Sequence, residues 1–339
     1  MNLALMAQVA GDSPSFLWKQ LPPIPDREGF AGAFAGVSQG SLLVAGGANF
    51  PGKKPWEGGK KIWYDGIFAL ATPTGEWKKV GKLPRPLGYG VSVTTAEGMV
   101  CVGGSDLERH YADAFMVTLS GSSVKIRLLP SLPVPMANGA GAVVGSVLYV
   151  FGGSDVPGEV SVFNRLFALD LSAPAAWKEL EPCPGKARLL PVAASLAGTC
   201  YVAGGATLQN STNKMTRVYL TDAWCYQPAK GWKRLADLPR PCVAGPSPAP
   251  VCGNRFYLVG GDDGSHVGFT PPDKHPGFAR DILVYDTITD AWQVAGPVPA
   301  PRAVLPVAFW QNQFVMPNGE IRPGVRSPEV WSLKLGAEP

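Results

Sequence analysis

The stretch LLVAGG at residues 42–47 joins an apolar run to a glycine doublet, and this pattern returns along the whole chain. The later copies are MVCVGG ending at Gly104, LYVFGG at Gly153, CYVAGG at Gly205, FYLVGG at Gly261 and a degenerate FVMPNG at Gly319. Successive copies are 49 to 58 residues apart. A recurring period of this size predicts one supersecondary unit repeated six times.

Each unit has the same internal order. A proline-rich entry precedes a run of small residues, the apolar run into the doublet follows, and a third apolar run comes after a variable loop. A tryptophan closes four of the units: Trp77, Trp177, Trp232 and Trp292. Four short strands separated by turn signals account for this order. Together with the glycine doublet and the late tryptophan, they are typical of a kelch β-propeller.

The two ends of the sequence complement each other. The segment EVWSLKL, with Trp331, resembles a third strand that lacks a fourth. The segment SFLWKQL, with Trp18, resembles a fourth strand that lacks the first three. We therefore expect an all-β, six-bladed propeller whose last blade is closed by the N- and C-terminal strands, which leaves no free sheet edge. Residues 15–339 are predicted to form this single domain, preceded by a loose segment, 1–14.

Segment 1–14 also bears on localisation. It contains a short apolar stretch and small residues, as the remnant of a signal peptide would, but it has no basic start. A truncated signal peptide would make the protein periplasmic, and otherwise we expect it to be cytoplasmic.

Composition excludes several classes of protein. The 339 residues carry 30 basic and 26 acidic side chains, a net charge of +4 without the basic stripe that nucleic acids require. No apolar run reaches the ~18 residues of a membrane helix. The six cysteines form no CxxC pair and are expected to be buried thiols. The copper site of kelch oxidases needs at least two histidines, a tyrosine and a cysteine-modified tyrosine. The chain has only three histidines, His110, His266 and His275, and the last two share one loop, so we expect no metal or cofactor.

Strand direction predicts which face carries function. Because direction alternates within a blade, the loop entering strand 1 and the loop between strands 2 and 3 emerge on one face. The longest loops of the second kind follow Gly47 and Gly261, and long loops in a compact fold tend to be functional. The entry loops bring arginines to this face: Arg85, Arg188, Arg240 and Arg302.

The residue after each doublet shows where one unit departs from the others. These residues are Ala48, Ser105, Ser154, Ala206, Asp262 and Glu320. The sixth unit combines a broken doublet with Glu320 and two nearby arginines, Arg322 and Arg326. Departure from a repeat's own rule often marks a functional position. A simple salt bridge in a surface loop is the alternative explanation of this spacing.

Four segments resemble the bacterial N-acetylneuraminate epimerase family: GFAGAFAGVSQGSLLVAGGANF (29–50), EGGKKIWYDGIFAL (57–70), PLGYGVSV (86–93) and PNGEIRPGVRS (317–327). They occur in a shifted order, as in a cyclically permuted, mutarotase-like branch of the family. The resemblance implies a kelch propeller that interconverts sialic acid anomers. It places the proton acceptor on Glu320 and its functional partner on Arg326. More weakly, it places substrate-binding positions on Arg188, Tyr89, Lys60 and Lys61.

The chemistry of the implied reaction assigns roles to these residues. Mutarotation removes a proton from the anomeric hydroxyl and delivers one to the ring oxygen, so Glu320 is expected to act as the base. Arg326 is expected to hold the substrate carboxylate, since a guanidinium binds a carboxylate through two bonds. Arg188 and Arg302 are further candidates for substrate binding.

Two non-catalytic functions remain open from the sequence. The propeller could bind a sugar acid without turnover, or it could bind a protein partner, because propellers host many functions. The expected partner is a small-molecule sugar acid, with no nucleic acid and no membrane, and protein partners stay unspecified.

Overall fold

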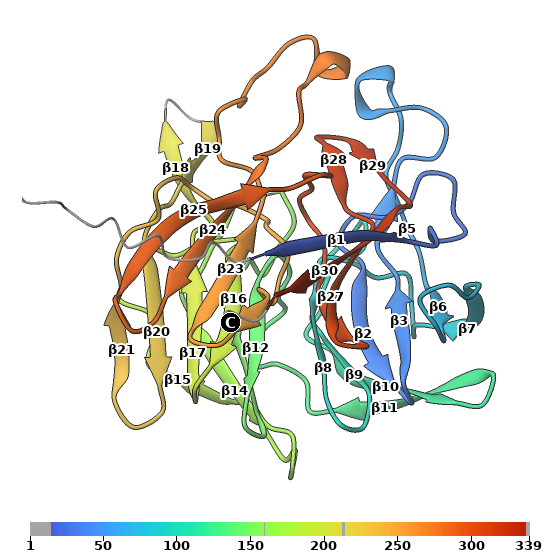
Figure 1. Ribbon diagram of the computed structural model, residues 1–339, viewed down its shortest axis with the longest axis horizontal. Coiled ribbons are helices and arrows are strands. Elements are labelled where there is room, and N and C mark those ends of the chain that lie inside the picture. Colours follow the sequence, from blue (N-terminus) through green and yellow to red (C-terminus); the bar gives the residue numbers. More distant parts are fainter. Residues whose placement is uncertain (1–14, 159, 212–213, 337–339) are drawn as a thin grey trace, which may run out of the picture.

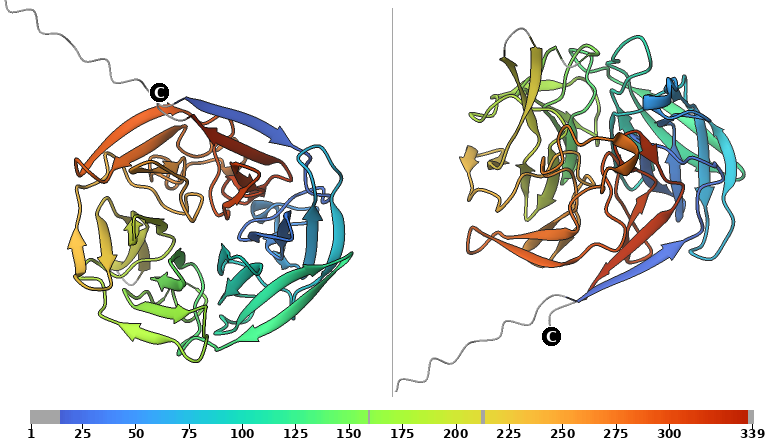
Figure 2. Two further views of the ribbon diagram at one scale, coloured as in Figure 1. Left: turned by 60° about the horizontal axis from the view of Figure 1, so that its bottom comes forward. Right: turned by 90° about the horizontal axis from the view of Figure 1, so that it is seen from above.

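The computed structural model describes residues 15–158, 160–211 and 214–336. In this part of the chain, six four-stranded antiparallel sheets are arranged as blades around a central axis (Figures 1 and 2). The prediction of an all-β, six-bladed propeller is confirmed. The prediction for residues 1–14 lies outside the described residues.

Each blade uses consecutive strands of the sequence, apart from the last. The first blade contains β2 (Phe34–Ser38), β3 (Ser41–Ala45), β6 (Gly66–Leu70) and β7 (Lys78–Lys82). The second contains β8 (Val91–Thr94), β9 (Met99–Val102), β10 (Ala114–Ser120) and β11 (Ser123–Leu129). The third contains β12 (Ala140–Val144), β13 (Val147–Phe151), β14 (Leu166–Asp170) and β15 (Lys178–Leu180).

The second half of the ring repeats this order. The fourth blade contains β16 (Val192–Leu196), β17 (Thr199–Ala203), β20 (Ala223–Gln227) and β21 (Gly231–Arg234). The fifth contains β22 (Val251–Cys252), β23 (Arg255–Val259), β24 (Asp281–Asp286) and β25 (Ala291–Pro297). The sixth contains β26 (Ala308–Trp310), β27 (Gln313–Pro317), β30 (Val330–Leu335) and β1 (Phe16–Leu21).

The sixth blade closes the ring with strands from opposite ends of the sequence. Strand β1 pairs antiparallel with β30, from Phe16 opposite Leu335 to Leu21 opposite Val330. Figure 2 shows these two strands side by side at the point where the first and last blades meet. The predicted closure by the two terminal strands is confirmed, but the expectation of no free sheet edge is wrong, because each blade is a separate four-stranded sheet with its own outer edge strand.

The glycine doublets end the second strand of each blade in left-handed backbone. At Gly47 the φ angle is +89°, and a Cβ atom there would lie 2.8 Å from the Cβ of Phe30. Only glycine satisfies both constraints without displacement. In the sixth blade Asn318 takes the first doublet position with a φ of +63°, which asparagine tolerates better than most side chains.

The late tryptophans join neighbouring blades. The indole of Trp77 donates to the carbonyl of Pro22 at 2.8 Å, and that of Trp177 donates to Pro130 at 2.7 Å. Trp232 and Trp292 make the equivalent bonds to Glu181 and Ala236. Each bond reaches the segment that ends the preceding blade, so these tryptophans join each blade to the one before it.

Three small hairpins extend one face of the propeller. They are β4 (Ala48–Asn49) with β5 (Ile62–Trp63), β18 (Ala206–Ser211) with β19 (Lys214–Tyr219), and β28 (Glu320–Arg322) with β29 (Val325–Arg326). Each lies between the second and third strands of its blade, on the face at the top of Figure 1. The same face carries the 3₁₀ turns η1 (Pro55–Glu57) and η2 (Pro272–Lys274). The sequence had predicted the long loops after Gly47 and Gly261 but missed the β18–β19 hairpin.

The cysteines behave as the sequence predicted. All six are free thiols, and five of them are buried. Burial raises the pKa of Cys242 to about 11 and that of Cys200 to about 12, which keeps these thiols protonated and unreactive. Within the described residues, no helix is both long and apolar enough to cross a membrane.

Candidate active site

A closed ring of backbone hydrogen bonds surrounds the propeller axis. Its members are the residues that enter the first strand of each blade: Gly32, Tyr89, Asn138, Leu190, Ala244 and Val304. The amide of each donates to the carbonyl of its neighbour in the preceding blade at 2.6 to 2.9 Å, and the sixth bond, from Gly32 to Val304, closes the circle. All six have a positive φ. Five are not glycine, a strained arrangement that persists because the ring fixes it from both sides.

The residues after the doublets form the next layer above this ring. Each makes an antiparallel bridge with the residue that precedes a ring member, as Glu320 does with Ala303 and Asp262 does with Val243. The six positions compared in the sequence are therefore equivalent in space. Ala48 and Ala206 are buried, whereas the four polar members line a central cavity: Ser105, Ser154, Asp262 and Glu320.

The central cavity opens on the face that carries the hairpins. Its volume is about 580 Å³, within the range of small-molecule sites. The ring residues form its floor and the long loops form its walls. The lining side chains that can be charged, titrate or donate hydrogen bonds are Lys61, Trp63, Tyr89, Ser105, Asp106, His110, Asn138, Ser154, Arg217, Asp262 and Glu320.

Glu320 and Arg326 face each other across the β28–β29 hairpin, where their backbones are paired. Arg326 Nη2 lies 2.8 Å from Glu320 Oε1, and the side chains are 3% and 15% exposed respectively. The arginine also contacts the Tyr89 hydroxyl at 3.4 Å and the Ala48 carbonyl at 3.4 Å, and its guanidinium lies 4.7 Å from the centre of the Phe50 ring. These contacts hold Arg326 in one position, so it fixes the carboxylate of Glu320 in turn.

The position of Arg326 differs from the role expected of it. The sequence interpretation had this side chain binding the substrate carboxylate, but the structure places it behind Glu320 and outside the cavity wall. Its Nη1 is buried and has no partner among the described residues. Arg326 therefore contacts the carboxylate of Glu320 and does not line the cavity itself.

Lys61 supplies a cation to the cavity. Its ammonium lies 4.2 Å from the centre of the Tyr89 ring and 4.8 Å from that of Trp63, and all three side chains line the wall. Stacking against two aromatic faces restricts the ammonium and adds cation–π attraction. The neighbouring Lys60 is exposed and does not line the cavity. Of the lysine pair, the structure therefore brings only Lys61 to the site.

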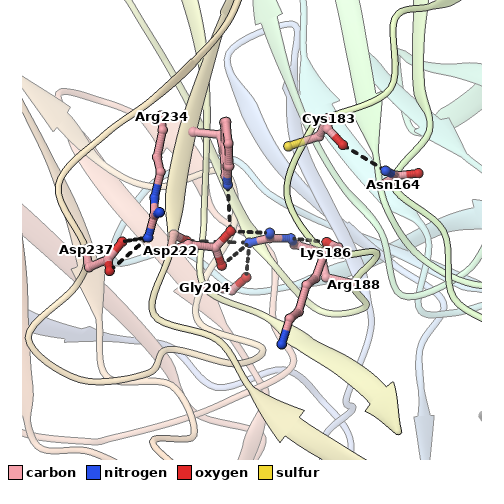
Figure 3. A network of polar contacts seen from close by, with 9 residues as sticks. Asn164, Cys183, Lys186, Arg188, Gly204, Asp222, Arg234 and Asp237 are labelled. Atoms are coloured by element: carbon pink, nitrogen blue, oxygen red, sulfur yellow. Dashed lines mark hydrogen bonds and ion pairs between the residues drawn. The ribbon is translucent and has the colours of Figure 1, made fainter.

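Arg188 and Arg302, which the sequence analysis expected to bind substrate, are not brought to the central cavity. Arg188 is fully buried within its blade, where it makes two bonds to the Asp222 carboxylate, at 2.6 and 3.0 Å, and a third to the Gly204 carbonyl (Figure 3). Arg302 is 4% exposed and paired with Glu329. Neither lines the cavity.

The remaining entry-loop arginines, Arg85 and Arg240, are also ion-paired within their own blades. Arg85 pairs with Asp113 at 2.7 Å and Arg240 pairs with Asp281 at 2.5 Å. In each of these four blades, an entry-loop arginine binds an acidic residue at the start of the third strand. The recurring arginines are thus a structural feature of the repeat, and they do not gather around the axis as the sequence suggested.

His110 is one of the cavity-wall residues that sequence reasoning missed, together with Trp63, Asp106 and Arg217. It is 7% exposed, and its Nδ1 lies 3.0 Å from the carbonyl oxygen of Ser154 in the next blade. From the sequence, the three histidines had been interpreted only as potential copper ligands, and that interpretation was set aside. A signal was present nonetheless, because His110 lies five residues after Ser105, a doublet-following position that points into the cavity, and its backbone bridges to that residue.

The loop after Gly261 encloses a second cavity beside the first. This side cavity has a volume of about 450 Å³, and it shares Arg217, Asp262 and Pro323 with the central one. Asp262 accepts a hydrogen bond from the Tyr219 hydroxyl at 2.6 Å. The other two histidines, His266 and His275, line the side cavity and are not part of the lining of the central one. No group of three or more potential metal ligands occurs among the residues that the structure describes.

Comparison with known proteins identifies the family. A family model described as N-acetylneuraminate epimerase matches residues 4–126 and 129–270. An N-acetylneuraminate epimerase from Haemophilus influenzae is 30% identical over 242 residues, which are 64% of this chain and 62% of that protein. One from Salmonella arizonae is 44% identical over 110 residues, 28% of each chain. The chain thus spans less than two thirds of the length of the curated relatives it matches.

Proposed function

The chain belongs to the N-acetylneuraminate epimerase family, and on this basis we propose that it interconverts the α and β anomers of N-acetylneuraminate. The observation that carries the proposal is the Glu320 carboxylate, which lines a cavity of about 580 Å³ while the buried Arg326 fixes it from behind. Acid–base isomerisation of a sugar needs such a positioned group and no cofactor.

The reaction proceeds through the open chain. N-acetylneuraminate is a cyclic hemiketal with a carboxylate on its anomeric carbon. Glu320 takes the proton of the anomeric hydroxyl, the bond between the anomeric carbon and the ring oxygen breaks as a ketone forms, and the carboxyl returns the proton to the departing ring oxygen. Rotation about the bond beside the ketone and closure on the other face then give the second anomer. One proton moves from oxygen to oxygen, and nothing is oxidised or reduced.

Lys61 is the proposed site of the substrate carboxylate. It lies on the blade next to that of Glu320, with its ammonium held over Tyr89 and Trp63. Charge-assisted hydrogen bonds to a carboxylate are about twice as strong as neutral ones. Binding there would bring the anomeric carbon, one bond away from the carboxylate, toward Glu320.

Timing anomer exchange by proton NMR tests the proposal. A sialidase releases the α anomer from a sialoside, and its conversion to the β anomer is followed with and without the protein. We expect faster equilibration, and we expect Glu320→Gln to abolish the acceleration because the amide cannot accept the proton.

A matched control is Glu179→Gln. Glu179 is also ion-paired, to Arg165 at 2.7 Å, but it lies on β15 outside the cavity. This variant should keep full activity. Absence of acceleration by the wild-type protein would contradict the proposal and leave a sugar-acid-binding or protein-binding propeller as the explanation.

A further inference from the structure

His110 faces the central cavity without a role in the mechanism above. It lies in the loop between β9 and β10, where a backbone bridge to Ser105 and burial to 7% exposure fix its position. It lines the same cavity as Glu320 and Lys61. Buried histidines inside a ligand cavity are strong candidates for proton transfer, because the imidazole titrates near neutral pH.

The contact with Ser154 defines which nitrogen of His110 is available. A carbonyl oxygen can only accept, so the contact of 3.0 Å requires a proton on Nδ1. Burial is the main cause that lowers the pKa of His110 from its ordinary 6.5, which favours the neutral imidazole. In that form Nε2 carries a lone pair, and no hydrogen bond to Nε2 is found among the described residues.

Blade order places His110 and Glu320 on either side of Lys61. Glu320 belongs to the sixth blade, Lys61 to the first and His110 to the second. These three blades are consecutive around the axis (Figure 2). A substrate whose carboxylate is held at Lys61 would thus have a proton acceptor on each side of its anomeric carbon.

Two proton acceptors match what the proposed reaction demands. The hydroxyl of the α anomer and that of the β anomer project from opposite faces of the sugar ring, so a single fixed carboxylate reaches only one of them well. We propose that His110 is the proton-transfer group for the anomer whose hydroxyl points away from Glu320. This inference rests on the proposed function.

The proton balance is as follows for closure on the side of His110. Nε2 takes the proton of the ring hydroxyl as its oxygen attacks the keto carbon. The carbon–oxygen double bond becomes a single bond, and the imidazolium returns the proton to the new anomeric oxygen. The imidazole ends neutral, with its Nδ1–H still bonded to Ser154.

Other charged groups around His110 modify its titration. The nearby carboxylates of Asp106 and Asp155 oppose the effect of burial on the pKa of His110, which nevertheless stays below its ordinary value. The charged side chains that share the cavity wall are Lys61, Arg217, Asp106, Asp262 and Glu320. Activity should therefore decline as the pH falls through a value below 6.5, where imidazolium formation removes the Nε2 lone pair.

The test is the pH profile of anomer exchange between about pH 5 and 8, measured for the wild type and His110→Asn. Asparagine can still donate to the Ser154 carbonyl but has no group at the position of Nε2. We expect exchange to slow about 100-fold or more, equally in both directions because an enzyme cannot alter the equilibrium, and the acid limb assigned to His110 to disappear. His275→Asn, in the side cavity, is the matched control and should change neither rate nor profile.

One further measurement, together with the outcomes of the pH profile, separates the possible results. Free imidazole should partly restore activity to His110→Gly, which a merely structural role would not allow. If the wild type accelerates exchange but has no acid limb below pH 6.5, the role of His110 is overturned whether or not the variants fold. The same holds if folded His110→Asn retains the wild-type rate and profile. If the wild type does not accelerate exchange at all, the proposed function itself fails.

Discussion

Arg326 lies behind Glu320 and not beside it: its Nη2 is 2.8 Å from Glu320 Oε1, yet its own side chain is only 3% exposed. The carboxylate therefore stands between the guanidinium and the cavity. This arrangement distinguishes the position of Glu320 from that of Arg326, which the sequence motif at residues 317–327 does not do by itself. Glu320 lines the cavity, whereas Arg326 contacts Glu320 from outside the cavity lining.

The first prediction concerns this separation. Arg326→Met should lower kcat by about 100-fold, since loss of the ion pair frees the carboxylate to leave its productive position, while KM changes little. Steady-state anomer exchange by NMR gives both constants. A large rise in KM with an unchanged kcat would show that Arg326 binds the substrate carboxylate directly.

The second prediction distinguishes the two adjacent lysines. Lys61→Met should raise KM by about tenfold or more, because a hydrogen bond between charged groups contributes about 1.5–3 kcal/mol. Lys60→Met is the control with the same change of charge, and it should behave as wild type because Lys60 is exposed outside the cavity. Equal effects of the two substitutions would indicate general electrostatic attraction in place of a defined carboxylate site.

The third prediction tests the structural assignment of Arg188. Asp222→Ala leaves a fully buried guanidinium without its counter-ion, which should destabilise the fold by about 3–5 kcal/mol. Asp237→Ala breaks an exposed pair with Arg234 and should cost about 0–1 kcal/mol. Urea unfolding measures both. Folded Asp222→Ala should bind substrate as the wild type does. A selective loss of substrate binding would instead indicate that Arg188 takes part in binding the substrate.

The fourth prediction is the pH dependence of stability. Burial alone would raise the pKa of Asp222, but hydrogen bonds and the charge of Arg188 outweigh it and hold this pKa below the ordinary 3.8. A lowered pKa in the folded state means that the stabilisation is complete above the unfolded value and disappears as the pH falls through the folded value. The free energy of unfolding should thus decrease below about pH 4, and this decrease should be smaller in Asp222→Asn than in the wild type.

Much of the fold could be predicted from the sequence because the same pattern of strands and turns occurs several times along the chain. Six copies of one pattern defined the strands, the doublets and the blade number, and the two incomplete ends implied the closure that β1 and β30 make. Glu320 was found by the same logic, since it follows a broken doublet and stands beside two arginines at a position where four of the five equivalent residues are Ala or Ser. The roles of the site residues remain predictions for the experiments above.

The sequence by itself determined the architecture and which face carries the cavity, because glycine doublets and strand periodicity act through local backbone geometry. Only the tertiary structure decided which charged side chains reach that cavity. In the sequence, Arg188 and Lys61 are both basic candidates for substrate binding. In the structure, Arg188 is ion-paired with Asp222 within its blade, whereas the ammonium of Lys61 lies over the rings of Tyr89 and Trp63. A charged or polar side chain pairs with a partner that folding brings close to it. Arg326 contacts Tyr89, which is 237 residues away in the sequence, and no local sequence pattern can encode a pairing over such a separation.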